Sequence, residues 1–315
     1  MKLDKVISGI DSSGSFRVYM SVSTGMVQKA HELHDTTPLA THLLGRALIG
    51  TGLMGIMLRE PGFKVTFQFK GDGPAQQVLC TAGSDGSVKG YVLNPYVDLP
   101  AREDGSPDVG GALGIGTLTC IRDVGVTEPY VGRIDFVNGE IADDLTAYFF
   151  ISEQQNTSVS LGVKLDDEAN VKAAGGMIIQ MLPDATEGAI AALENWLPQM
   201  PRISDLVEQV TGNAVGRTPE SIMQEYMHTA FLGMPDEFKI IPMDTLDMGW
   251  NCDCSEERLE QVVMSLGAKE IGAIIEEDGQ AEISCQFCRT AYHFDKEHLE
   301  RLRLECLGNR FKIQA

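Results

Sequence analysis

Two closely spaced pairs of cysteines near the C-terminus are the residues in this chain best suited to chemistry. Cys252 and Cys254 have one residue between them, and Cys285 and Cys288 have two. No other cysteine lies between the two pairs. Four thiolates in two tight pairs satisfy the tetrahedral sulfur coordination that zinc prefers in structural sites. We therefore expect one zinc ion per chain, held by all four cysteines.

The spacing alone leaves more than one use of this cluster open. A structural zinc ribbon that serves a binding protein would hold the metal permanently, whereas a redox site would exploit the reaction of thiolates with oxidants. A thiol–disulfide oxidoreductase would use Cys285 and Cys288 at the start of a helix in a βαβ unit. Expected strands at residues 281–285 and 290–294 flank this pair and disfavour the oxidoreductase.

The elements that must position the four cysteines form a short C-terminal segment, residues 251–315. Ser255 is a helix N-cap for a helix that ends near Leu266, a second short helix spans residues 269–276, and Asp295 caps a last helix to about Cys306. A unit of this size usually has too small an apolar core to fold without a metal or another cross-link. The segment therefore predicts a small zinc-binding domain.

Residues 1–183 predict an α+β domain in which strands and helices are interspersed. Strands are expected within residues 5–27 and at 65–70, 77–81, 88–93, 117–121, 130–137 and 158–164, with a helix at 142–154. Thr37 and Pro38 start a helix that runs to about Arg59. Glycines inside this helix, among them Gly45, Gly52 and Gly55, would weaken it in water, so we expect it to be buried and closely packed.

The glycine-rich stretch 110–116 does not predict a nucleotide site. A phosphate-binding loop follows a strand and opens a helix, whereas this stretch precedes an apolar strand. We expect a loop at a sheet edge.

Between these domains, residues 184–250 have eleven acidic and three basic residues. Short amphipathic helices are expected at 186–197, 204–210 and 218–232, and such helices are marginal in isolation. The segment is either a helical linker or an element that can switch. The fold class is thus α+β: a mixed sheet-and-helix N-terminal domain, an acidic helical linker and a small C-terminal zinc-binding domain.

Composition restricts the partners. The net charge of −20 arises from 45 acidic and 25 basic residues, which disfavours nucleic acid as a partner. The longest apolar run, residues 47–58, is interrupted by glycines and is too short to span a membrane, and the first twenty residues lack a signal sequence. We expect a soluble, cytoplasmic protein. His31, His34 and His42 have no matching nucleophile and carboxylate set, so we expect no enzyme.

The cysteines lie in a distinctive context. The C-terminal motifs are Cys252-Asp253-Cys254-Ser255-Glu256-Glu257-Arg258, Leu266-Gly267, and Cys285-Gln286-Phe287-Cys288 followed by Tyr292 and Phe294. The N-terminal motifs include Leu44-Gly45-Arg46, Gly71-Asp72-Gly73-Pro74, Pro129-Tyr130-Val131-Gly132 and Ala174-Gly175-Gly176. Together they closely resemble the heat shock protein 33 family of redox-regulated chaperones, over nearly the full chain.

The resemblance implies an ATP-independent holdase that takes part in the stress response and binds unfolded client proteins. It implies an inactive reduced form with zinc on the four cysteines. Oxidation would form the disulfides Cys252–Cys254 and Cys285–Cys288, release zinc, unfold the linker and favour a homodimer. We expect no nucleic-acid or membrane partner.

Overall fold

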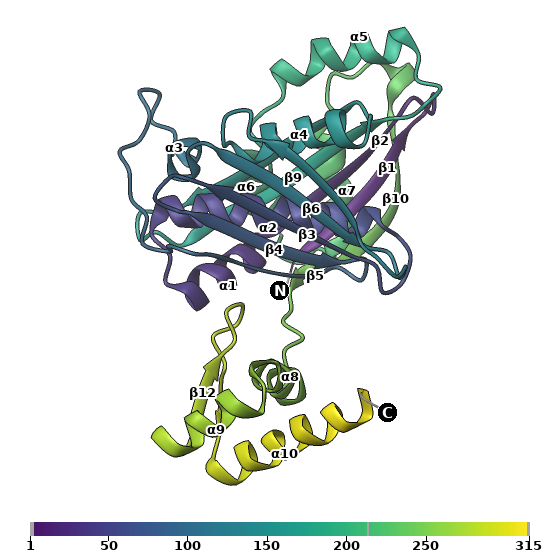
Figure 1. Ribbon diagram of the computed structural model, residues 1–315. Helices are drawn as coiled ribbons and strands as arrows, with labels where there is room; N and C mark the ends of the chain where they lie inside the picture. The colour runs from purple at the N-terminus through teal and green to yellow at the C-terminus, as the bar shows by residue number, and fades with distance from the viewer. Residues whose placement is uncertain (1–2, 213, 314–315) are drawn as a thin grey trace. The chain divides into compact units, whose positions relative to one another are not determined.

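The computed structural model describes residues 3–212 and 214–313 of the chain. These residues form two compact units, Met1–Asn251 and Cys252–Ala315, each of which is described here by itself. The first unit contains two sheets, of five and six strands (Figure 1). In spatial order the five-stranded sheet is β10 (Ile240–Asp247), β1 (Lys5–Asp11), β2 (Phe16–Val22), β9 (Val171–Met181) and β8 (Thr157–Leu165). The six-stranded sheet is β11 (Gly249–Trp250), β5 (Ser87–Val92), β4 (Gln77–Gly83), β3 (Lys64–Gly71), β6 (Gly116–Asp123) and β7 (Tyr130–Asp135).

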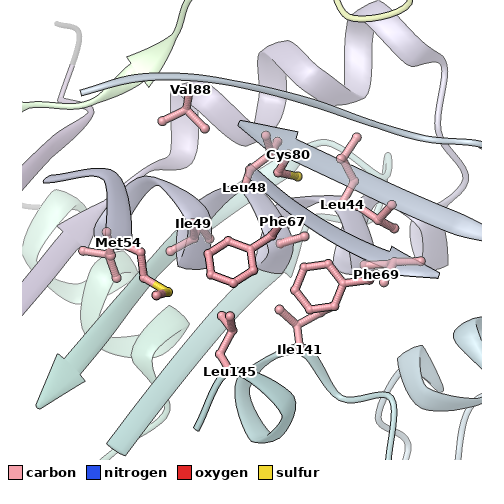
Figure 2. Packing of buried hydrophobic residues seen from close by; sticks show 14 of the residues in the cluster. Leu44, Leu48, Ile49, Met54, Phe67, Phe69, Cys80, Val88, Ile141 and Leu145 are labelled. Carbon is pink, nitrogen blue, oxygen red and sulfur yellow. The ribbon is translucent and has the colours of Figure 1, made fainter. Parts of the chain in front are cut away.

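Helix α2 (Pro38–Met57) packs against strands of both sheets and organises the main core. It begins as predicted, because the Thr37 hydroxyl accepts a hydrogen bond from the Ala40 N–H at 3.3 Å and Pro38 is the first helical residue. Leu44, Leu48 and Ile49 project from it toward Phe67 and neighbouring core residues (Figure 2). Burial of this apolar surface is the main source of stability here.

The glycines of α2 serve close packing, which confirms the prediction. A Cβ atom at Gly45 would lie 2.7 Å from a methyl carbon of Val27, and one at Gly52 would lie 2.6 Å from the sulfur of Met248. Helix α2 is also the one described helix long and apolar enough to cross a membrane, but 89% of its most apolar window is buried in the protein core. Its apolar composition is therefore explained by its position in the core.

Helices α6 (Ile203–Gly212) and α7 (Pro219–Ala230) cover the other face of the five-stranded sheet, and α5 (Glu187–Trp196) packs into the same apolar cluster. Their apolar sides and the sheet form a second core cluster, in which Leu206, Met223 and Tyr226 are buried. Thr186 and Thr218 cap α5 and α7 through hydrogen bonds from backbone N–H groups. The three helices expected between residues 184 and 250 are confirmed, and each buries an apolar side in this cluster.

Four sequence-based expectations about secondary structure were wrong or incomplete. Residues 24–27, expected as strand, begin helix α1 (Thr24–His34). Strand β9 was missed, because its nearly continuous burial leaves no polar–apolar alternation to detect. The segment expected to be only helical also contributes β10, which pairs with β1. The glycine-rich stretch contains a short helix, α3 (Val109–Leu113), before β6.

The helix expected at 142–154 is confirmed as α4 (Ile141–Ser152).

The second unit contains three helices and a hairpin among its described residues. They are α8 (Glu256–Leu266), α9 (Ala268–Glu277), the strands β12 (Ala281–Ser284) and β13 (Ala291–Phe294), and α10 (Lys296–Ile313). Within the described part of this unit, the buried core consists of Val263, Ile271, Phe294, Leu299 and Leu302. So small a core contributes little net stability after the chain entropy is subtracted.

Candidate metal centre

Cys252 and Cys254 lie in the extended segment between β11 and α8. Helix α8 begins directly after them, because the Ser255 hydroxyl accepts a hydrogen bond from the Arg258 N–H at 3.4 Å. The Arg258 guanidinium also reaches back to Asp253, with 2.7 Å to its carboxylate and 2.9 Å to its carbonyl oxygen. The helix start therefore fixes the backbone on both sides of Cys254.

Cys285 and Cys288 lie in the turn that joins β12 to β13. The Cys285 N–H donates to the Thr290 carbonyl at 2.9 Å, and the Arg289 N–H donates to the Cys285 carbonyl at 2.8 Å. Arg289 has φ 61°, the left-handed conformation that lets the chain reverse here. The predicted strand–turn–strand arrangement around this pair is confirmed.

The structure brings the four sulfurs together as predicted. Cys252 Sγ lies 3.8 Å from Cys285 Sγ, Cys254 Sγ lies 3.3 Å from Cys288 Sγ, and all four lie within 4.8 Å of one another. In a tetrahedral zinc–thiolate site with Zn–S of about 2.3 Å, neighbouring sulfurs are roughly 3.8 Å apart. The donor set and its spacing therefore fit one zinc-sized ion.

Two hydroxyl groups contact these sulfurs, and the sequence pattern assigned a role to neither. Tyr292 Oη donates a hydrogen bond to Cys254 Sγ at 3.1 Å, and Cys288 Sγ is hydrogen-bonded to Thr290 Oγ1 at 3.2 Å. Both residues belong to β13 or to the turn before it. The only available signal was their place beside the second cysteine pair, since outer-shell partners of metal ligands are commonly near the ligands.

Without a metal, Cys252, Cys254 and Cys288 do not ionise equally. Burial raises the pKa of Cys252 and of Cys254. Burial acts in the same sense on Cys288, but hydrogen bonds from Thr290 and contacts with the other thiols outweigh it and lower its pKa to about 6. The hydrogen bond to Cys254 raises the pKa of Tyr292 to about 12. A dication at the centre would remove this asymmetry, because it stabilises every thiolate that binds it.

The remaining cysteines and His293 lie outside the cluster. Cys80 on β4 and Cys120 on β6 are buried, as expected for core thiols, and burial raises the pKa of Cys120 to about 12. Cys306 on α10 is partly buried, with its sulfur 3.4 Å from the Met264 carbonyl oxygen. His293 pairs across the hairpin with Glu282 at 3.2 Å. None of them adds a ligand to the four.

Glu256, Glu260 and His298 form a second group of potential ligands that the sequence analysis did not identify. The guanidinium of Arg301 already lies 2.6 Å from Glu260 and 2.7 Å from His298 Nε2. A bound cation would have to displace this positive charge. The group is therefore an ion-pair network between α8 and α10.

Fold and site together define a two-unit protein: a large α+β unit followed by a small unit organised around a four-cysteine, metal-type centre. A family model described as Hsp33 protein matches residues 4–295. The chain belongs to the Hsp33 family.

Relatives match over almost their whole length. A 33 kDa chaperonin of Alkaliphilus oremlandii is 42% identical over 309 residues, which are 98% of this chain and 99% of that protein. A 33 kDa chaperonin of Ruminiclostridium cellulolyticum is 40% identical over 95% of this chain and 97% of its own. Among solved structures, the 33 kDa chaperonin (heat shock protein 33 homolog) of Thermotoga maritima matches with a TM-score of 0.81, 31% identity and 99% coverage of both chains.

Proposed function

We propose that this chain is a redox-regulated, ATP-independent holdase chaperone of the cytoplasm. In the reduced form, Cys252, Cys254, Cys285 and Cys288 hold zinc and the protein does not bind clients. Oxidation to two disulfides releases the zinc and activates the protein. The observation that carries this proposal is the cluster of four sulfurs within 4.8 Å of one another, in a unit whose own core is small.

The four cysteines supply the chemistry of the switch. A bound zinc ion would keep their sulfurs deprotonated, and the thiolate is the form that oxidants attack. A thiolate of Cys285 or Cys288 attacks peroxide, forming a sulfenic acid and releasing hydroxide. The other thiolate of the pair then attacks the sulfenic sulfur, forming the disulfide and releasing a second hydroxide. Cys252 and Cys254 consume a second peroxide in the same way, and their tight ring is readily reduced.

Loss of the metal unfolds the second unit. Structural zinc contributes roughly 10–16 kcal/mol to the folding of small zinc domains, more than most domains have in net stability. The described core of this unit has only five buried residues to replace that contribution. Each disulfide removes two of the four ligands, so the cluster cannot survive oxidation.

The chain before Cys252 links this event to the first unit. The Asn251 N–H donates to the Val88 carbonyl at 2.9 Å, and the rings of Trp250 and His34 pack edge to face at 6.0 Å. Unfolding that spreads past Asn251 first breaks these contacts and then reaches β10 and α7. Their departure from the five-stranded sheet would expose an apolar face that includes Phe16, Val18 and Met20.

Exposed apolar sheet is the surface that unfolded client proteins need, and no step requires a nucleotide. We propose that the oxidised protein is a homodimer and that neither nucleic acid nor membrane is a partner. Thiol–disulfide oxidoreductase activity is the alternative, because the lowered pKa of Cys288 favours a thiolate. The hairpin position of Cys285 and Cys288 opposes it, since such enzymes place the pair at a helix N-terminus.

The test treats the reduced, zinc-loaded protein with peroxide and follows zinc release, disulfide pairing by peptide mapping, and suppression of client aggregation. We expect zinc release, disulfide formation and aggregation suppression to increase together in the wild type and in the control Cys306→Ser. Cys254→Ser should bind less than stoichiometric zinc. Zinc release without aggregation suppression would contradict the switch, and steady turnover in an insulin-reduction assay would favour the oxidoreductase.

A further inference from the structure

Among the described residues, strand β7 has a pairing partner on one side only. It is the last strand of the six-stranded sheet and pairs antiparallel with β6 on its other side. The Phe136 N–H donates to the Gly116 carbonyl at 2.9 Å, so residues in phase with Phe136 bond to β6. Backbone bonding alternates along an antiparallel strand. The N–H and C=O groups of Val131, Arg133 and Asp135 therefore point to the open side.

Exposed apolar side chains occur on this strand, just after it and on the adjoining helix α4. Val131 is 57% exposed and Val137, just after the strand, is 63% exposed. On helix α4, Phe150 and Ile151 are 65% and 60% exposed. The end of α4 is close to the start of the strand, since Tyr130 Oη lies 3.3 Å from Ser152 Oγ. Apolar surface beside an open strand edge is typical of a protein-binding site.

The charges on the strand identify the partner. Arg133 and Asp135 are both exposed, have opposite signs and lie two residues apart on the same face. Opposite charges directly across an antiparallel strand pair stabilise it, whereas like charges destabilise it. In an antiparallel pair with a second copy, centred on Ile134, Arg133 lies opposite Asp135 of the other copy. Val131 then lies near Val137, just beyond the end of the other copy's strand.

Neighbouring registers lack this complementarity. A shift by two residues in one direction places Arg133 opposite Arg133, and a shift in the other direction places Asp135 opposite Asp135. A shift by one residue places the open backbone groups out of phase. The register centred on Ile134 thus combines opposite charges, apolar cross-strand contacts and matching hydrogen-bond groups.

We propose that the free edge of β7 pairs with β7 of a second copy of this chain, antiparallel about a two-fold axis at Ile134. Each Arg133–Asp135 pair exchanges two backbone hydrogen bonds, and the two six-stranded sheets become continuous. The contact is isologous, so it closes as a dimer and does not propagate.

This interface rests on the proposed function in one respect, because we assign it to the homodimer proposed for the oxidised protein. A single strand pair with flanking side chains buries less than the roughly 1,200–2,000 Å² of a stable interface. We therefore expect a concentration-dependent dimer.

Sedimentation velocity of the full-length protein, reduced and oxidised, over a concentration series tests the interface. Arg133→Asp and Asp135→Arg each place like charges opposite one another, and each should weaken dimerisation about tenfold or more. The double variant R133D/D135R places opposite charges together again and should recover wild-type dimerisation. Lys70→Asp, at an exposed position of β3 in the same sheet, is the matched control. Zinc content and circular dichroism verify folding of every variant.

Recovery in the double variant supports this register, because exchanging the two charges restores attraction only between two copies of β7. It would not restore the binding of a client peptide to the same edge. Absence of recovery, unchanged dimerisation in both single variants, or a monomer throughout overturns the inference. Aggregation suppression by the oxidised wild type is measured separately. An active protein whose dimer ignores these charges leaves the proposed function intact and removes only the interface.

Discussion

At the scale of single residues, the hydrogen bonds to the sulfurs decide how the cluster behaves. Tyr292 donates to Cys254, and this bond stabilises negative charge on that sulfur. A sulfur that shares its charge with a hydroxyl is a weaker nucleophile but a better-oriented ligand. Under the proposed function, the tyrosine would therefore set both how firmly a metal is held and how fast Cys254 is oxidised.

Tyr292→Phe removes this hydroxyl and leaves the ring. We expect zinc affinity to fall about tenfold, because loss of an outer-shell partner commonly weakens a metal site by 10–100-fold. Competition with a chromogenic chelator measures the affinity. Tyr96→Phe, which alters an exposed tyrosine of the first unit, is the control. An unchanged affinity in Tyr292→Phe would show that the hydrogen bond does not support the metal site.

Asp144, in the first turn of α4, is a buried carboxyl group with a different consequence. Its Oδ1 accepts a hydrogen bond from the Val137 N–H at 2.7 Å, and Oδ2 has no partner among the described residues. Burial raises its pKa from the ordinary 3.8 to about 6. The folded state therefore favours the neutral acid. The resulting stabilisation is complete below about pH 4 and is lost as the pH rises through 6.

Asp144→Asn keeps the acceptor oxygen and removes the charge. We expect the variant to gain about 1–3 kcal/mol in free energy of unfolding over wild type near pH 7.5, and less near pH 5. Urea unfolding at the two pH values measures this. The neighbouring exposed Asp143→Asn should show little pH-dependent gain. A gain equal at both pH values would contradict a raised pKa.

At the scale of elements, the segment from α5 to β10 has two opposing properties. It buries large apolar residues on the five-stranded sheet, and β10 adds a strand beside β1. It also contains a buried polar atom with no described partner, the hydroxyl of Tyr226 on α7. An unsatisfied buried hydroxyl costs about 1–3 kcal/mol. Helix α7, which would have to leave the sheet during activation, is thus less stable than it would be without this hydroxyl.

Tyr226→Phe should remove that penalty. We expect the first unit to gain about 1–2 kcal/mol and the amides of α7 to exchange more slowly with deuterium. Under the proposed function, peroxide activation should also slow. Tyr19→Phe is a matched control. The Tyr19 hydroxyl accepts a hydrogen bond from Arg59 at 3.2 Å, so removing that hydroxyl should not stabilise the first unit. Equal or lower stability of Tyr226→Phe would indicate a partner for the hydroxyl.

At the scale of the whole molecule, the two units differ in what stabilises them. The first has two extensive core clusters around its sheets, whereas the described core of the second has five buried residues. Large apolar cores scale in stability with buried area, and small ones depend on cross-links or metals. We therefore expect the two units to respond differently to loss of metal.

Chelation of the reduced, full-length protein should unfold the second unit while β2, β3 and β9 stay protected from hydrogen exchange. Calorimetry should show a low-temperature transition that disappears with chelator and a second transition that remains. If α7 and β10 lose protection in the chelated protein, the units are coupled as the proposed function requires. A single transition insensitive to chelator would show that metal does not stabilise the second unit.

The sequence by itself determined the features that depend on a few neighbouring residues. Caps such as Thr37 and Ser255, the helices α2 and α5 to α7, and the two cysteine pairs were all predictable, because hydrogen bonds and apolar periodicity act over one or two turns. The spacing of the two pairs also predicted the four-cysteine cluster, whose sulfurs do come together. Its metal, disulfides and redox role stay predictions.

Only the tertiary structure decided which distant segments meet. Residues 240–247 form a strand because β1, more than 200 positions earlier, offers an open edge, and β9 forms because both of its faces are buried. The contact between Tyr292 and Cys254 likewise requires the hairpin to fold back on the segment before α8. Such pairings depend on burial and long-range backbone bonding, which no local pattern of residues encodes.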